Sequence, residues 1–127
     1  MTRAVRGAIQ VEQDTREAIW DAASLLVSRL MEENRLPEDA IVSLVFSVTR
    51  DLRSANPAAG LRRQGFSQVP LFCLQEADVD GGMPRVIRAL LTYTTRSRRQ
   101  PVPVYLGGAR ALRPDLPPAD PAGAARP

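Results

Sequence analysis

The stretch IVSLVFSVT, residues 41–49, limits the choice of fold more than any other part of the chain. It is apolar and rich in β-branched residues, which predicts a buried strand. The stretch RAVRGAIQVE at residues 3–12 mixes β-branched residues with alternating polarity and predicts an opening strand. The two stretches together predict that the chain is built around a β-sheet.

A long helix is predicted between these two strands. Asp14 is expected to cap its N-terminus, and Glu17, three positions later, is expected to complete a capping box. The helix is expected to end near Asn34, before a turn that begins at residues 36–39 (LPED). The residues with helical spacing along one face are Ile19, Ala22, Ala23, Leu26, Val27 and Leu30.

Beyond residue 49 the pattern predicts shorter elements. A short helix is expected to start at Asn56 and Pro57, run through Arg62 and Arg63, and stop at Gly65. The residues 85–94 (RVIRALLTYT) have a period that also fits a helix, but a sheet protein needs a partner strand there. Three further strands are therefore expected, at residues 69–74, 85–94 and 103–109, with a glycine turn at 80–82.

The predicted order β-α-β-α-β-β-β indicates an α+β protein with a mixed β-sheet, one long helix and one short helix. We expect a single domain over residues 1–116. Residues 117–127 are rich in Pro and Ala, and we expect a mobile C-terminal tail there. A chain of 127 residues leaves much apolar surface uncovered, so we also expect association with identical subunits.

The composition excludes several kinds of chemistry. The chain has no histidine and one cysteine, Cys73, so a Ser-His-Asp triad, a Cys-His pair and an internal disulfide are ruled out. The usual zinc and copper ligands are also missing, and we expect no metal. The glycine pairs at 81–82 and 107–108 match neither the dinucleotide nor the P-loop pattern, and we expect no cofactor.

The charge points to a small anionic ligand. The net charge is +3, and the arginines are scattered apart from Arg96, Arg98 and Arg99, with few aromatic residues near them for base stacking. We therefore expect no nucleic acid partner. No apolar run approaches a membrane span and the N-terminus lacks the core of a signal peptide, so we expect no membrane and a cytoplasmic location. The remaining Arg, Glu, Tyr and Cys suit a reaction that needs positioning and electrostatics.

Five pieces of the chain, in order between residues 3 and 116, carry a resemblance. They are VRGA at 5–8, CLQEADVDGG at 73–82, IRAL at 87–90, VYL at 104–106 and LRPDL at 112–116. The chain resembles the monofunctional chorismate mutases of the trimeric pseudo α/β-barrel class, as opposed to the all-helical class. The resemblance implies an isomerase of aromatic amino-acid (Phe/Tyr) biosynthesis that converts chorismate to prephenate without a cofactor.

The resemblance also implies a homotrimer with active sites in clefts between neighbouring subunits. Arg6 and Tyr105 would hold a substrate carboxylate, and Arg88 would face the ether oxygen of the breaking bond. Glu76 would accept a hydrogen bond from the ring hydroxyl, with Cys73 close beside it. The pocket would be lined by Phe72, Cys73, Leu74, Gln75 and Glu76, and its mouth would be closed by Arg62 and the Arg113 segment.

Three positions depart from the family pattern. The family usually has an aromatic residue where this chain has Asn56, a lysine at Ala59 and a small polar residue at Phe72. These changes bear on affinity more than on reaction type. Two alternatives stay open: a trimeric imine deaminase-like or small-anion-binding relative with arginine in the cleft, and a basic protein that binds nucleic acid.

Overall fold

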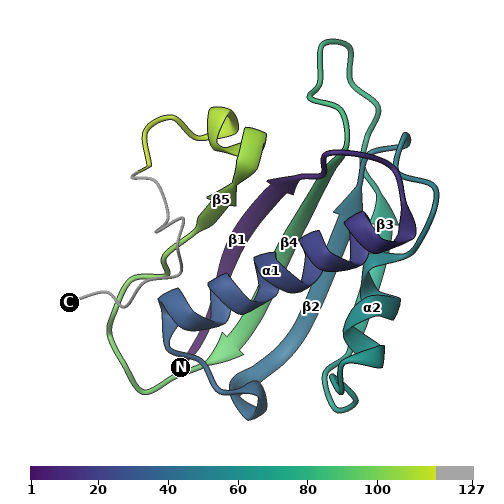
Figure 1. The fold of residues 1–127 in the computed structure, drawn as a ribbon. Helices are drawn as coiled ribbons and strands as arrows, with labels where there is room; N and C mark the ends of the chain where they lie inside the picture. The colour runs from purple at the N-terminus through teal and green to yellow at the C-terminus, as the bar shows by residue number, and fades with distance from the viewer. Residues whose placement is uncertain (117–127) are drawn as a thin grey trace.

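The computed structural model describes residues 1–116, and the expected tail at 117–127 lies outside the described residues. A five-stranded sheet forms one layer and two α-helices form the other (Figure 1). The strands are β1 (Thr2–Gln10), β2 (Ile41–Val48), β3 (Leu71–Gln75), β4 (Val86–Thr94) and β5 (Val104–Leu106). The helices are α1 (Arg16–Asn34) and α2 (Pro57–Arg63), with 3-10 turns η1 (Glu38–Ala40) and η2 (Gly107–Leu112).

The sheet is mixed, in the order β3-β2-β4-β1-β5. Strand β4 runs antiparallel to both β1 and β2, whereas β3 is parallel to β2 and β5 is parallel to β1. The expected α+β class, with one long and one short helix, is therefore confirmed. The short strands β3 and β5 form the two edges.

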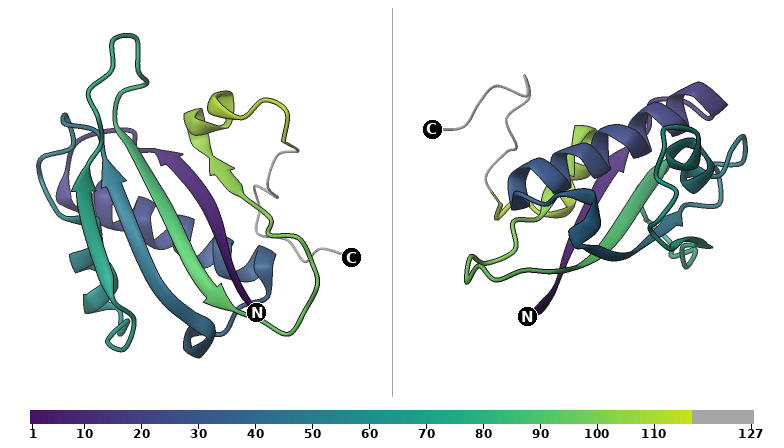
Figure 2. Two further views of the ribbon diagram at one scale, coloured as in Figure 1. Left: turned by 180° about the vertical axis from the view of Figure 1, so that it is seen from behind. Right: turned by 90° about the horizontal axis from the view of Figure 1, so that it is seen from below.

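Both α-helices lie on the same side of the sheet, and the opposite side is bare (Figure 2). We call this bare side the open face. The loop between β3 and β4, residues 76–85, projects beyond the end of the sheet (Figure 1). Among residues 1–116, no helix is long and apolar enough to cross a membrane.

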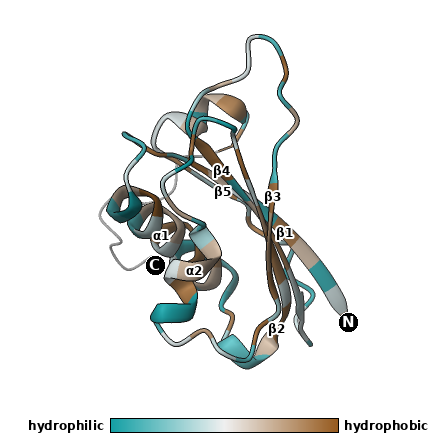
Figure 3. Ribbon diagram, turned by 90° about the vertical axis from the view of Figure 1, so that its right-hand side faces the viewer, coloured by the Kyte–Doolittle hydropathy of each residue, from teal (hydrophilic) through white to brown (hydrophobic). Residues whose placement is uncertain are grey.

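The main core lies between the sheet and the helices, where apolar segments face each other (Figure 3). Phe46 of β2 and Ile87 of β4 are fully buried there. Gly7 is needed at the point where β1 passes under α1, because a Cβ atom at this position would lie 2.8 Å from the Val104 carbonyl oxygen and 3.0 Å from a methyl group of Leu26. The close approach fixes β1 and β5 against the helix layer.

The start of α1 differs from the prediction. Thr15, and not Asp14, is the N-cap, and its Oγ1 accepts a hydrogen bond from the Ala18 backbone N–H at 3.2 Å. The Asp14 carboxylate instead accepts from the backbone N–H groups of Arg53 and Ser54, and these bonds hold its pKa below the usual value, with Ser54 contributing most. The predicted capping box with Glu17 was therefore wrong. The local pattern could not indicate the true partners of Asp14, because Arg53 and Ser54 lie 39 and 40 residues away along the chain.

Three strand boundaries also differ. The first strand is Thr2–Gln10, shorter at its C-terminal end than the predicted 3–12. The strand predicted at 69–74 is Leu71–Gln75, since Pro70 has no N–H to donate. The strand predicted at 103–109 ends at Leu106, because Gly107 has a φ of 58° and turns the chain into η2. The predicted strand at 85–94 is confirmed as Val86–Thr94.

Candidate active site

The register of the sheet assigns side chains to the open face. Arg88 of β4 is paired with Ala8 of β1 and with Ser47 of β2. Ala8 is in turn paired with Tyr105 of β5, and Arg6 lies two residues before Ala8 on the same strand. Because paired residues and alternate residues of a strand share one face, all five positions lie on the open face.

The centre of this arrangement is an ion pair between Arg88 and Glu76. The Arg88 Nε lies 2.7 Å from Glu76 Oε1, and the two side chains are 42% and 24% exposed. Glu76 follows directly after β3, and its backbone N–H donates to the Val48 carbonyl at 2.8 Å. The backbone bond extends the β2–β3 pairing by one residue and directs the Glu76 side chain toward β4.

Ser47 makes a second contact with Glu76. Its Oγ lies 3.1 Å from Oε1, the oxygen that also contacts Arg88. Among the described residues, Glu76 Oε2 and the two terminal nitrogens of Arg88 make no hydrogen bond, so they are available to a ligand. The terminal nitrogens of Arg88 can therefore donate to a ligand and Glu76 Oε2 can accept from one, and the ion pair holds all three atoms in place beforehand.

The ion pair borders a cavity of about 550 Å³ at the end of the sheet. Its walls include Thr49, Glu76, Arg88 and Leu112, together with the projecting loop around Gly81 and Gly82. A cavity of this volume accommodates a small organic molecule. The available groups suit a ligand that carries both an anionic group and a hydroxyl.

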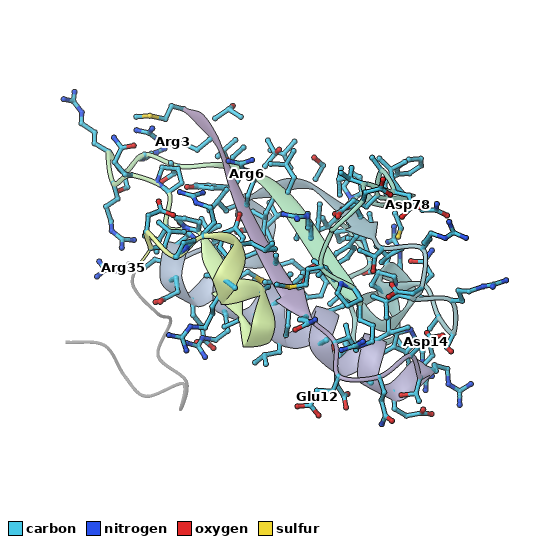
Figure 4. The ribbon with its side chains drawn as sticks, turned by 90° about the horizontal axis from the view of Figure 1, so that it is seen from above. Arg3, Arg6, Glu12, Asp14, Arg35 and Asp78 are labelled. Atoms are coloured by element: carbon cyan, nitrogen blue, oxygen red, sulfur yellow. The ribbon has the colours of Figure 1, made fainter. Side chains whose placement is uncertain are left out.

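Arg6 adds a second cation to the open face. Its side chain is exposed, and within residues 1–116 it makes no hydrogen bond or ion pair. Figure 4 labels Arg6 part-way along β1. An arginine in this state keeps its whole donor fork for an anion.

Tyr105 and Arg113 form a third part of the open face. Tyr105 is buried in a small cluster with Ala8, Val86 and Ala109. The guanidinium of Arg113 lies 5.9 Å from the centre of its ring. Arg113 also pairs with Asp115 through two bonds, at 3.0 and 3.1 Å, and this pairing lowers the pKa of Asp115. The segment after η2 is thus held against β5.

Two of the predicted site residues lie elsewhere in the chain. The Cys73 side chain packs against the main core on the helix side of β3, and burial raises the pKa of its thiol. Arg62, in the last turn of α2, donates to the carbonyls of Phe66 and Ser67 at 3.3 and 3.5 Å. One chain therefore does not bring Cys73 and Arg62 together with Arg88.

The remaining predicted lining residues follow the alternation of β3. Phe72 and Leu74 point to the open face and are 62% and 50% exposed, and Gln75 is exposed at the end of the strand. Asn56, one of the departures from the family pattern, caps α2 by accepting from the Ala58 N–H at 2.9 Å. Ala59 is exposed on α2.

Sequence reasoning did not identify Ser47 or the turn that follows β2. Thr49 accepts from the Val86 N–H, and Asp51 accepts from the Arg85 N–H, so the turn is tied to the start of β4. A signal for Ser47 was present, because it is a polar residue in an apolar strand.

Among residues 1–116, no group of three or more His, Cys, Asp or Glu side chains could hold a metal ion.

Comparisons with known proteins agree with the expected family. The family model for chorismate mutase type I matches residues 2–116. The chain is 43% identical over 118 residues to a chorismate mutase from Thermus thermophilus, covering 91% of this chain and 97% of that protein. It is 38% identical over 118 residues to the one from Bacillus subtilis (strain 168), covering 91% and 93%.

Similarity extends to the solved structures. A chorismate mutase from Clostridium thermocellum superposes with a TM-score of 0.81 and 35% sequence identity, covering 86% of this chain and 98% of that one. The fold and the open face define the class, an α+β protein whose mixed sheet carries arginines and a carboxylate on its uncovered side. The chain belongs to the chorismate mutase type I family. The predicted chorismate mutase function, an isomerase activity, is confirmed, and the deaminase-like alternative is not favoured.

Proposed function

We propose that this chain rearranges chorismate to prephenate on the open face, with Arg88 at the breaking C–O bond. The observation that carries the proposal is that only one of the three guanidinium nitrogens of Arg88 is used within the chain. Its Nε is held by Glu76 at 2.7 Å, while its terminal nitrogens make no hydrogen bond among the described residues. The guanidinium is therefore fixed in place and still free to donate.

Positioning is the first part of the mechanism. Chorismate is a dianion, and its rearrangement requires a compact chair-like conformer that brings the two reacting carbons together. Arg6 and Tyr105 hold one carboxylate of this conformer from β1 and β5. Arginine suits this task because its planar fork binds a carboxylate through two parallel bonds. Selecting the reactive conformer removes much of the entropic cost of reaching the transition state.

Electrostatic stabilisation is the second part. Cleavage of the C–O bond runs ahead of C–C bond formation, so negative charge grows on the ether oxygen in the transition state. A cation already placed there stabilises the transition state more than the bound substrate, and this difference raises kcat. No group has to change its protonation state during the reaction.

Glu76 has two roles in this proposal. Its Oε1 orients Arg88, and its Oε2, which makes no hydrogen bond among residues 1–116, accepts from the ring hydroxyl of chorismate. Ser47 is a positioning residue, because its bond to Oε1 fixes the carboxylate from the neighbouring strand. The three residues come from β2, β4 and the end of β3, so the sheet itself sets their geometry.

We also propose that the active sites lie between subunits of a homotrimer. Phe72, Leu74 and Leu90 leave large apolar side chains exposed on the open face, at 62%, 50% and 42%. Such a patch is typical of a surface that a second copy covers. Cys73 and Arg62 lie away from Arg88 within one chain, so we assign them to the active site of a neighbouring subunit. The exposed side chains of Phe72, Leu74 and Gln75 would form the wall between the two subunits.

Arg113 closes this site from the C-terminal side. Its guanidinium already lies over the Tyr105 ring, so a small movement of the segment after η2 carries it toward a bound carboxylate. Residues 1–116 are sufficient for the fold and the chemistry in this proposal. A cytoplasmic location, expected from the sequence, stays a prediction.

The direct test is the reaction itself. The purified chain is mixed with chorismate in the presence of a metal chelator, and loss of the diene absorbance in the ultraviolet is followed. Prephenate is identified by its conversion in acid to phenylpyruvate. We expect rapid turnover that the chelator does not affect. A folded, assembled protein that left chorismate unchanged would contradict the proposed function.

A further inference from the structure

Arg29 is a buried cation without a partner. It lies in the C-terminal half of α1 and is only 6% exposed. Within residues 1–116 it makes no hydrogen bond, ion pair or ring contact. Among the described residues, Arg3 Nε is the one side-chain nitrogen or oxygen that is fully buried and has no hydrogen-bond partner. The Arg29 nitrogens also have no partner, so they are not fully buried and remain in contact with open space. A buried charge in this state is costly unless something pairs with it.

The open space beside Arg29 is a cavity of about 450 Å³. One wall is a flank of α1, formed by Ala18, Ala22, Leu25 and Arg29 at helical spacing. The alanines leave room there, and long helical side chains point back toward the N-terminus of their helix, so the Arg29 guanidinium is directed along this hollow. The opposite wall comes from the C-terminal end of β1 and from β5.

The cavity lies on the helix side of the sheet, away from Arg88 and Glu76. Ile9 of β1 belongs to the main core, which faces α1, whereas Ala8 next to it lies on the open face. Figure 4 likewise labels Glu12, at the rim of the cavity, on the side of α1. A ligand held by Arg29 therefore lies on the opposite side of the sheet from Arg88 and Glu76, although Tyr105 of the edge strand β5 borders both the cavity and the open face.

We propose that this cavity binds a small monocarboxylate with an apolar body about the size of one aromatic ring. The carboxylate pairs with the Arg29 fork, and the body packs against Ala18, Ala22 and Leu25. Arg110 at the rim adds positive charge, whereas Glu12 disfavours a second anionic group on the ligand. The two arginines and one glutamate leave one positive charge in excess, which matches a ligand with a single carboxylate.

The test uses the assembled protein, labelled with ¹⁵N, and 3-phenylpropionate as the probe. We expect concentration-dependent shifts of the backbone amides of Leu25, Leu106 and Gly107. The amide analogue 3-phenylpropanamide has the same shape without the charge, and we expect it to bind at least about tenfold more weakly. Equal affinity for the acid and the amide, or no shift with the acid at concentrations on the order of 10 mM, would overturn the proposal.

Two variants locate the site. Arg29→Met keeps the length of the side chain and removes its charge, and we expect binding to weaken at least about tenfold with kcat for chorismate unchanged. Arg88→Met should leave binding of the probe unchanged. Shifts that disappear in Arg88→Met would mean that the probe binds in the active site. Dissociation of the assembly by Arg29→Met, seen by light scattering, would mean that Arg29 contacts another subunit. Either result contradicts the proposal, and if Arg29→Met does not fold, the acid–amide comparison still decides.

Discussion

At the scale of single residues, Arg88, Glu76 and Ser47 depend on one another. Glu76 Oε1 contacts both the Arg88 Nε and the Ser47 hydroxyl, at 2.7 and 3.1 Å. Two donors from different strands restrict the position of Oε1 more than a single donor would. The proposed reaction needs this rigidity, since an arginine that follows the charge only after it develops lowers the barrier less.

Ser47→Ala tests this dependence. Removing the hydroxyl loosens Glu76 and, through it, Arg88, so we expect kcat to fall about three- to tenfold while KM changes little. Steady-state rates with chorismate measure both quantities. Ser47→Thr, which keeps the hydroxyl, should restore kcat, and Ser43→Ala, on the same strand, is the matched control. A native kcat in Ser47→Ala would remove the positioning role.

Cys73 provides a test that depends on pH. Burial raises the pKa of its thiol, so the folded protein keeps Cys73 protonated at a pH where a free cysteine already ionises. We expect alkylation by iodoacetamide to be slow near neutral pH and to rise with a midpoint above that of the unfolded chain. Mass spectrometry of both states across pH measures this. A lower midpoint in the folded state would indicate an activated thiolate instead.

The individual site residues also show which parts of the site can be predicted from the sequence. Arg88 and Glu76 were selected through the resemblance, since each alone reads as an ordinary surface charge. Their contact brings together the residue after β3 and the middle of β4, and no local pattern encodes it. The roles assigned to Arg6, Tyr105 and Cys73 stay predictions.

At the scale of elements, the start of α1 departs from the capping box that its sequence predicts. Asp14 and Thr15 are both good N-cap residues, and the spacing to Glu17 favoured Asp14. The structure uses Thr15 for the helix and Asp14 for the distant N–H groups of Arg53 and Ser54. The helix α1 was predictable because burial of one face sets its helical spacing, and β2 was predictable from its run of apolar, β-branched residues. The end of β5 was not, because it depends on the conformation of Gly107.

Thr15→Ala tests the cap. Loss of the side-chain acceptor leaves the Ala18 N–H without its partner, so we expect the free energy of unfolding to fall by about 1 kcal/mol. Denaturation in urea at fixed protein concentration measures the change. Thr15→Ser keeps the acceptor and should remain within a few tenths of the native value. If Thr15→Ala were as stable as the native protein, Thr15 would not be the cap.

At the scale of the whole molecule, the open face connects fold and activity. The helices cover one side of the sheet and leave the other to carry both the arginines and the exposed Phe72, Leu74 and Leu90. The small size of the chain predicted association, but the surface involved follows only from the order and register of the strands. In our proposal, assembly buries the apolar part of this face and completes the site.

Leu90→Glu tests the proposed assembly. Leu90 is 42% exposed on the open face, and a charged side chain there would have to be buried among apolar side chains of the interface, so we expect the trimer to dissociate. Because Leu90 is paired with Arg6 across β1 and β4, the new carboxylate would also attract Arg6, so the mass and not the activity is the readout. Light scattering after size-exclusion chromatography gives the mass. Leu25→Glu is the matched control, because Leu25 is 48% exposed on α1, and it should leave the mass unchanged. A trimer that persisted in Leu90→Glu would place the interface elsewhere.

The measurement that tests the central claim most directly is kcat at saturating chorismate for Arg88→Lys and Arg88→Met. Lysine keeps the charge but not the fork that contacts Glu76 with one nitrogen and the ether oxygen with the others. We predict that kcat falls by at least about 10²-fold in both variants while the assembly stays folded. A kcat near the native value in a folded Arg88→Met assembly would contradict the role of Arg88 as the electrostatic catalyst.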